Sequence, residues 1–147
     1  MIYLPDTNAF SAYLAGRSPN LTRRMSESFA ADQLRLSVMV LSELQFGAEK
    51  ARLDLGETKF VRRVRELQKQ VPLEPLGEQF PEFYARVRTQ LERGGRKIGD
   101  RDTIIAAHAL SLGAVLVTAN IAEFSRVGGL DVENWQGDDP RSSSAGG

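Results

Sequence analysis

The segment at residues 98–120, IGDRDTIIAAHALSLGAVLVTAN, decides the fold of this chain. Apolar residues fall on nearly every side of a helix over residues 103–112, so we expect that helix to be buried and Gly113 to end it. Residues 115–117 follow at once as a short, wholly apolar strand. Ligands of open parallel sheets gather at the carboxyl ends of strands. A helix that begins beside the acid Asp102, followed by a strand that ends in polar residues, therefore indicates half of an α/β site.

Length and composition indicate one soluble domain. The 147 residues are enough to bury a core, and the absence of cysteine excludes both a disulfide framework and a thiolate metal site. No apolar run approaches a membrane span and the N-terminus lacks a signal pattern, so we expect a cytoplasmic protein that does not enter a membrane. The 19 basic and 19 acidic residues balance, so net charge does not decide whether nucleic acid is bound.

Strands and helices alternate along the chain. We expect strands at residues 1–4, 34–38, 115–117 and 130–135, and helices at 9–14, 21–31, 39–50, 57–70, 78–93 and 103–112, with a helical turn at 121–124. Two prolines make residues 71–76 an edge strand at best. This order predicts an α/β fold, a three-layer α/β/α sandwich around a mostly parallel sheet of four to five strands. We expect the domain to span residues 1–135 and the polar residues 136–147 to be a disordered tail.

Asp6 follows the first strand directly. Pro5 keeps Leu4 extended and ends the strand, which places Asp6 just beyond its carboxyl end. An aspartate there most commonly caps the next helix. Asn8 is an alternative cap, and would leave Asp6 free for another role.

Glu43 is a carboxylate on the apolar stripe of its helix. Val40 and Phe46 are its neighbours on the same face, three residues away on either side. Burying a carboxylate without a partner is costly. Two interpretations remain open: Glu43 is a metal ligand, or it forms a salt bridge with a buried Arg or Lys.

The predicted sheet brings Asp6, Glu43 and Asp102 towards one edge, with Thr118 and Asn120 at the end of a neighbouring strand. Carboxylates that lie so close do not all stay ionised without a cation. Oxygen ligands select hard ions, Mg²⁺ or Mn²⁺, and such an ion supports hydrolysis of a phosphodiester. The basic residues Arg93, Arg96 and Lys97 lead into Asp102 and are either a solvated surface or a rim that contacts phosphates of a nucleic acid.

His108 is the only histidine. On an ideal helix it lies about 120° around and about 9 Å along from Asp102, so we expect it to pack or to face solvent rather than to catalyse. An alternative chemistry, a phosphatase with Asp6 as its nucleophile, requires a second acid where this chain has Asn8. It also requires a nearby lysine, for which Lys97 is the candidate.

Four segments resemble the PIN-domain toxins of VapBC toxin–antitoxin pairs: LPDTN at 4–8, LSEL with GAEK at 41–50, IGDRDTIIAAHA at 98–109, and LVTANIAEFSRVGGL at 116–130. The resemblance covers residues 1–135 in order. It implies a metal-dependent endoribonuclease that cuts transfer RNA or another structured RNA. It further implies a homodimer that is silenced by a partner antitoxin.

The resemblance also implies roles for residues. It makes Asp6, Glu43 and Asp102 the catalytic acids and metal ligands, and it favours Asp102 over Asp100, which is then a loop acid or an N-cap. Asn120 takes the position of a fourth catalytic acid. Asn8 and Thr118 are expected to support the site. Because Asn120 leaves the site one charge poorer, the alternative is a weakened PIN-like module that only binds RNA or a protein partner.

Overall fold

The strands form a parallel sheet at the centre of the molecule. A computed structural model describes residues 1–137 of the chain. Its strands are β1 (Tyr3–Pro5), β2 (Leu36–Ser37), β3 (Leu73–Glu74), β4 (Val115–Val117) and β5 (Val132–Glu133). β4 pairs in parallel with both β1 and β5, β2 pairs in parallel with β3, and a parallel bridge from Tyr3 to Leu34 joins the two parts. The predicted parallel sheet is confirmed.

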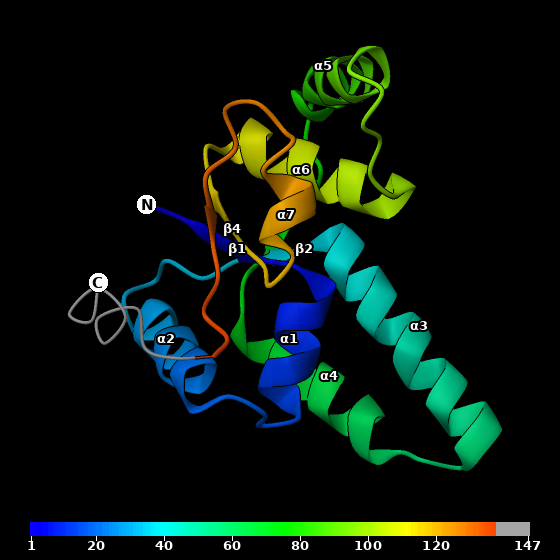
Figure 1. Cartoon of the computed structure of the whole chain (residues 1–147). Helices are drawn as coiled ribbons and strands as arrows, with labels where there is room; N and C mark the ends of the chain where they lie inside the picture. The colour runs from blue at the N-terminus through cyan, green and yellow to red at the C-terminus, as the bar shows by residue number, and fades with distance from the viewer. Residues whose placement is uncertain (138–147) are drawn as a thin grey trace.

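Helices cover both faces of this sheet. They are α1 (Thr7–Leu14), α2 (Pro19–Ala30), α3 (Val38–Leu55), α4 (Lys59–Gln70), α5 (Phe80–Arg93), α6 (Asp100–Leu112) and α7 (Ile121–Phe124). In Figure 1, α1, α2 and α4 lie on one side of the strands, and α5 and α6 on the other. The chain moves outward from β1 to β2 and β3 and then returns to β4. Right-handed crossovers in opposite directions place their helices on opposite faces, which gives the three predicted layers.

The helix predicted to be buried is buried. In α6, Ile105 and the alanines at 106, 107 and 109 are almost inaccessible to solvent, and the helix packs against α5. His108 is also fully buried, so of the two alternatives, packing and exposure to solvent, the structure shows packing. Gly113 ends α6 in the left-handed conformation, with φ of 62°, as glycine does at many helix ends.

The α3 and α4 helices pack against each other, and in Figure 1 the far end of α3 reaches beyond the other elements while α4 lies next to α1. The first turns of α3 contact β2 and α6, and they carry Glu43 towards the start of α6. No helix in the described part of the chain is long and apolar enough to cross a membrane. Of the predicted tail at residues 136–147, the part from residue 138 onward lies outside the described residues.

Candidate active site

Asp6 lies at the point where the chain leaves β1 beside the end of β4. Its backbone N–H donates to the Val117 carbonyl at 2.9 Å. Its Oδ1 accepts a hydrogen bond from the Ala9 N–H at 2.8 Å, so Asp6 is the N-cap of α1 and the alternative cap, Asn8, is wrong. The Asp6 residue is 6% exposed. Burial raises the pKa of Asp6, against the lowering effect of hydrogen bonds from Thr118 and Ala9.

Asp102 lies inside the first turn of α6. This helix begins at Asp100, three residues earlier than the apolar pattern predicts, and Gly99 is its N-cap. Asp100 is therefore neither a loop acid nor the cap, but the first helical residue, and it is exposed. The carbonyl of Gly99 accepts hydrogen bonds from both the backbone N–H and the hydroxyl of Thr103, each at 2.9 Å. These bonds explain the earlier start of the helix.

The pKa of the Asp102 carboxyl is raised by its burial and by the charges around it. Burial is the largest cause of its raised pKa, and the negative charges of Asp6, Glu123 and Glu43 raise that pKa further, while Arg101 lowers it. Three other acids therefore lie close enough to disfavour ionisation of Asp102. The sequence predicted two of them, Asp6 and Glu43. The structure adds Glu123.

Glu43 forms an ion pair that the sequence left open. Its Oε2 accepts a hydrogen bond from Nη1 of Arg101 at 2.9 Å. The Glu43 side chain is 19% exposed, but that of Arg101 is 65% exposed, so the partner is not the buried cation of the salt-bridge interpretation. Sequence reasoning missed Arg101, although it directly precedes Asp102 in the same helical turn. The role of Glu43 as a metal ligand stays a prediction.

The residues after β4 form a short hydrogen-bonded chain towards Asp6. The buried Thr118 hydroxyl accepts a hydrogen bond from the Asn120 N–H at 2.9 Å, and it lies close enough to the Asp6 carboxyl to lower the pKa of Asp6. The Asn120 amide donates to Oε2 of Glu123 at 2.6 Å. Asn120 stands at the N-cap position of α7 without a capping hydrogen bond, and Glu123 lies three residues later, the spacing of a capping box. That spacing was the signal by which the sequence could have indicated Glu123.

Several of these residues open onto one cleft of about 430 Å³. Its lining consists of Thr7, Asn8, Glu43, Gly99, Asp100, Arg101, Asp102 and Ile105. Asn8 lines this cleft and is exposed, and its supporting role stays a prediction. The Thr7 hydroxyl is buried and has no hydrogen-bond partner among the described residues. Buried hydroxyls are normally satisfied, so Thr7, the residue that follows Asp6, carries an unused polar group in the wall of this cleft, which Asp6 itself does not line.

The three predicted phosphate contacts lie beside this cleft and do not line it. Arg93 ends α5, Arg96 and Lys97 follow it, and all three side chains are exposed. Lys97 lines a separate, small cavity of about 60 Å³ with Tyr84 and Asp100. Their contact with RNA stays a prediction. The same placement disfavours the phosphatase alternative, which needs Lys97 near Asp6.

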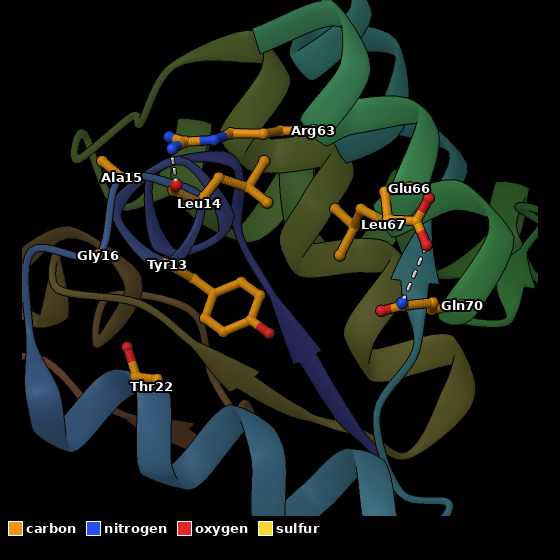
Figure 2. Close-up of a pocket in the computed structure, with 9 residues that line it drawn as sticks. All are labelled: Tyr13, Leu14, Ala15, Gly16, Thr22, Arg63, Glu66, Leu67 and Gln70. Carbon is orange, nitrogen blue, oxygen red and sulfur yellow. Dashed lines mark hydrogen bonds between the residues drawn. The ribbon is translucent and has the colours of Figure 1, made fainter. Parts of the chain in front are cut away.

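A second cavity of about 400 Å³ lies between the end of α1, α2 and α4 (Figure 2). Arg63 donates to the Leu14 carbonyl at 2.8 Å, and Gln70 donates to Glu66 at 3.1 Å. The arginine satisfies a carbonyl at the end of α1, a common arrangement at helix C-termini. Glu66 is the one carboxylate in the lining, and it is already hydrogen-bonded. This cavity therefore does not gather acids as the first cleft does.

The fold and the acids agree with a known family. The PIN domain family matches residues 3–130. The chain belongs to the PIN-domain family. This PIN domain is 34% identical to ribonuclease VapC2 of Rickettsia felis over 140 residues, 92% of this chain and 98% of the relative. It is 31% identical to the tRNA(fMet)-specific endonuclease VapC of Shigella flexneri over 137 residues, 90% of this chain and 97% of the relative.

The structural comparison agrees. The crystal structure of VapBC2 from Rickettsia felis bound to a DNA fragment from their promoter matches with a TM-score of 0.84 and 29% identity, over 92% of this chain and 100% of that chain. The predicted resemblance is confirmed: this is a PIN domain of the VapC type.

The acids of this PIN domain fit a hard divalent cation by their chemistry. Their donors are all oxygens, and none of the ion pairs among the described residues involves Asp6 or Asp102. The unpartnered Thr7 hydroxyl adds a polar group beside them. Within residues 1–137, no group of three or more His, Cys, Asp or Glu side chains is arranged tightly enough to hold a metal by itself. Mg²⁺ binds through one or two carboxylates and keeps several waters, so two acids suffice.

Proposed function

We propose that this VapC-type PIN domain is a Mg²⁺- or Mn²⁺-dependent endoribonuclease, the toxin of a toxin–antitoxin pair. The observation that carries the proposal is the pair of carboxyls, Asp6 and Asp102, whose pKa values are both raised and one of which is raised by the other. Such carboxyls gain from a cation between them. The Rickettsia relative is named a ribonuclease and the Shigella relative a tRNA(fMet)-specific endonuclease, and both names support RNA as the substrate.

In this proposal Asp6 and Asp102 hold the cation. Glu43 is not grouped with them in the described residues and joins them when it leaves Arg101. A bound divalent cation would activate water and stabilise the charge that develops on the phosphodiester. The protein's own contribution is orientation. The Ala9 N–H and the Thr118 hydroxyl hold the Asp6 carboxyl in place. The Asn120 amide donates to Glu123, an acid close enough to raise the pKa of Asp102, so in this proposal Asn120 positions that acid.

The partners in this proposal are RNA, an antitoxin and a second copy of the chain, in the cytoplasm. The match to a VapBC complex supports an antitoxin. The exposed apolar side chains of Phe46, Leu53 and Leu55 along α3 support a protein interface, because exposed apolar patches commonly mark binding surfaces. Transfer RNA is the first substrate to test, since the Shigella relative is named for one.

The experiment is RNA cleavage with and without a divalent cation. The purified protein should cut transfer RNA in Mg²⁺, and a chelator should stop the reaction. Asp6→Ala should be inactive, whereas Glu49→Gln, on an exposed carboxylate of α3 that pairs with Arg52, should retain activity. Sequencing of RNA ends after expression in cells would identify the cut. Cleavage that persists in the chelator would refute the metal dependence.

Asn120 favours a second candidate, a PIN-like module that binds RNA or a partner without cutting. The resemblance to PIN-domain toxins gives Asn120 the position of a fourth acid, and its amide donates to Glu123. This candidate predicts that neither the wild type nor Asp6→Ala arrests growth on expression. The nuclease predicts arrest by the wild type alone.

A further inference from the structure

Arg101 is the basic residue of the acidic cleft. Of the described residues that line this cleft, Arg101 alone carries a positive charge, against the acids Glu43, Asp100 and Asp102. Its charge acts on the site, because it lowers the pKa of Asp102. An RNA strand that approaches these acids meets repulsion from them. Arg101 is therefore placed where a polyanion first needs a cation from the protein.

The pair between Arg101 and Glu43 leaves most of the guanidinium available. One bond is made, from Nη1 to Oε2 at 2.9 Å. A guanidinium has five N–H donors in a fixed fork that matches a phosphate, and this side chain is 65% exposed. Ion pairs with an exposed partner are weak. The guanidinium can thus leave Glu43 at little cost when a divalent cation takes its place beside the carboxylate.

In the proposed function two cations bind the Glu43 carboxylate: the Arg101 guanidinium and the divalent metal ion. The guanidinium already holds Oε2, and a divalent cation near Asp102 draws on the same carboxylate. Two ligands that compete for one group weaken each other's binding by the same factor. Binding of the divalent cation therefore releases Arg101, and removal of Arg101 strengthens binding of the divalent cation.

We propose that Arg101 binds a phosphate of the RNA substrate, and that Glu43 holds its guanidinium until the divalent cation takes Glu43. This inference rests on the proposed function, because it assigns a phosphate-binding residue to that same cleft. In this order of events the divalent cation binds first, and the released Arg101 then binds the RNA phosphate. The inference also makes two predictions of opposite sign for one substitution: without Arg101, the protein binds the cation more tightly and RNA more weakly.

The first test measures the metal alone. Isothermal titration of Mn²⁺ into the RNA-free protein should show roughly two- to fivefold tighter binding by Arg101→Gln than by the wild type, the range expected for one exposed ion pair. Arg52→Gln is the matched control, because it breaks the exposed Arg52–Glu49 pair on α3, outside the cleft, and should leave the Mn²⁺ affinity unchanged. Unchanged or weaker Mn²⁺ binding by Arg101→Gln would overturn the competition.

A double-mutant cycle shows whether the gain passes through Glu43. In a Glu43→Gln background the carboxylate for which both cations compete is gone, so Arg101→Gln should no longer improve Mn²⁺ binding by the same factor. An equal gain in both backgrounds would mean that Arg101 repels the metal through space and is not held by Glu43. That result would overturn the exchange.

The second test measures RNA. With saturating Mg²⁺, Arg101→Gln should raise KM for the cleaved RNA roughly fivefold and change kcat by less than twofold. The slope of log(kcat/KM) against log salt should become shallower by about 0.7 to 0.9, the loss of one phosphate contact. Arg101→Lys keeps the charge, so it should restore the slope while KM stays raised, because it lacks the planar fork. A fall in kcat with unchanged KM and slope would overturn the phosphate contact.

Different results would refute the proposed nuclease function and the inference about Arg101. A wild type that does not cut RNA in Mg²⁺ refutes the nuclease, and with it the phosphate contact, while the Mn²⁺ titration still decides whether Arg101 competes for Glu43. A wild type that cuts RNA, together with an Arg101→Gln variant whose Mn²⁺ affinity, KM and salt slope all match it, refutes the Arg101 inference alone.

Discussion

The His108 ring on α6 is joined to the Ser37 hydroxyl at the start of α3, with Nδ1 and Oγ 2.9 Å apart. The other ring nitrogen, Nε2, lies 2.9 Å from the Pro75 carbonyl. A carbonyl only accepts, so Nε2 carries the proton and Nδ1 accepts from the serine. The same Ser37 oxygen accepts from the Met39 N–H at 3.2 Å and caps α3. One buried chain of hydrogen bonds therefore joins the helix of Asp102 to the helix of Glu43.

Loss of the Ser37 hydroxyl should destabilise the fold. Ser37→Ala removes the N-cap of α3 and leaves the buried His108 Nδ1 without a donor, at a cost of about 1–3 kcal/mol. Chemical denaturation of the metal-free protein measures it. Ser42→Ala is the control, because that exposed hydroxyl bonds only the Val38 carbonyl within α3, and it should change stability by less than about 0.5 kcal/mol. Equal effects of the two substitutions would contradict the linkage.

Burial of His108 should make the fold less stable in mild acid. Burial lowers its pKa, against opposing effects of the Pro75 carbonyl and of the Glu74 charge. Below about pH 6.5 the unfolded chain then binds more protons than the native one. Stability is therefore complete above that pH and falls as the pH drops below it. His108→Asn should show a flatter dependence between about pH 5 and 7, measured by urea unfolding. An equal slope in both proteins would assign the loss to other groups.

Asp6→Asn should stabilise the metal-free protein at neutral pH. The pKa of Asp6 is raised in the fold. The contribution of Asp6 to the free energy of unfolding is therefore complete below its pKa in the unfolded chain, and it is lost as the pH rises through its pKa in the folded protein. Asparagine keeps the cap on α1 without the charge. The melting temperature at pH 7 should rise by roughly 2–5 °C, and the gain should vanish near pH 4. Added Mg²⁺ should stabilise the wild type more than the variant. A lower melting temperature at pH 7 would show that the charge itself is stabilising.

Asp102→Asn should abolish Mg²⁺-dependent RNA cleavage without unfolding the protein, because it removes a proposed metal ligand and keeps the side-chain shape. Asp100→Asn, two residues earlier in the same turn and exposed, is the matched control and should retain most activity. Gel assays with a transfer RNA, alongside circular dichroism, measure both. If Asp100→Asn were inactive and Asp102→Asn active, the two acids would have to exchange roles.

Replacing Arg93, Arg96 and Lys97 together by Ala should weaken RNA binding most at low salt. Three phosphate contacts to single-stranded RNA would change the slope of log affinity against log salt by about 2. Fluorescence anisotropy over a range of salt concentrations tests this. The three exposed residues lie outside the acidic cleft, so Mn²⁺ affinity should stay unchanged. An unaltered salt slope would move the RNA path elsewhere.

The fold could be predicted because its signals are local. The apolar pattern at residues 103–117 and the glycine at 113 specify a buried helix, its end and a buried strand from a few neighbouring residues. The first helical residue of α6 was not predicted, since its start depends on how Thr103 bonds back to Gly99. The cap of α1 was left open between Asp6 and Asn8 because both residues can cap a helix.

The sequence by itself determined which acids follow the strands, and hence the end of the sheet at which chemistry is expected. Only the tertiary structure decided which charges meet. Glu43 pairs with Arg101 across 58 positions of the chain, and Glu123 acts on Asp102. Electrostatic energy depends on distance and burial in space. Those quantities are fixed by the packing of α3 against α6 and by the turn after β4, and no local pattern of residues contains them.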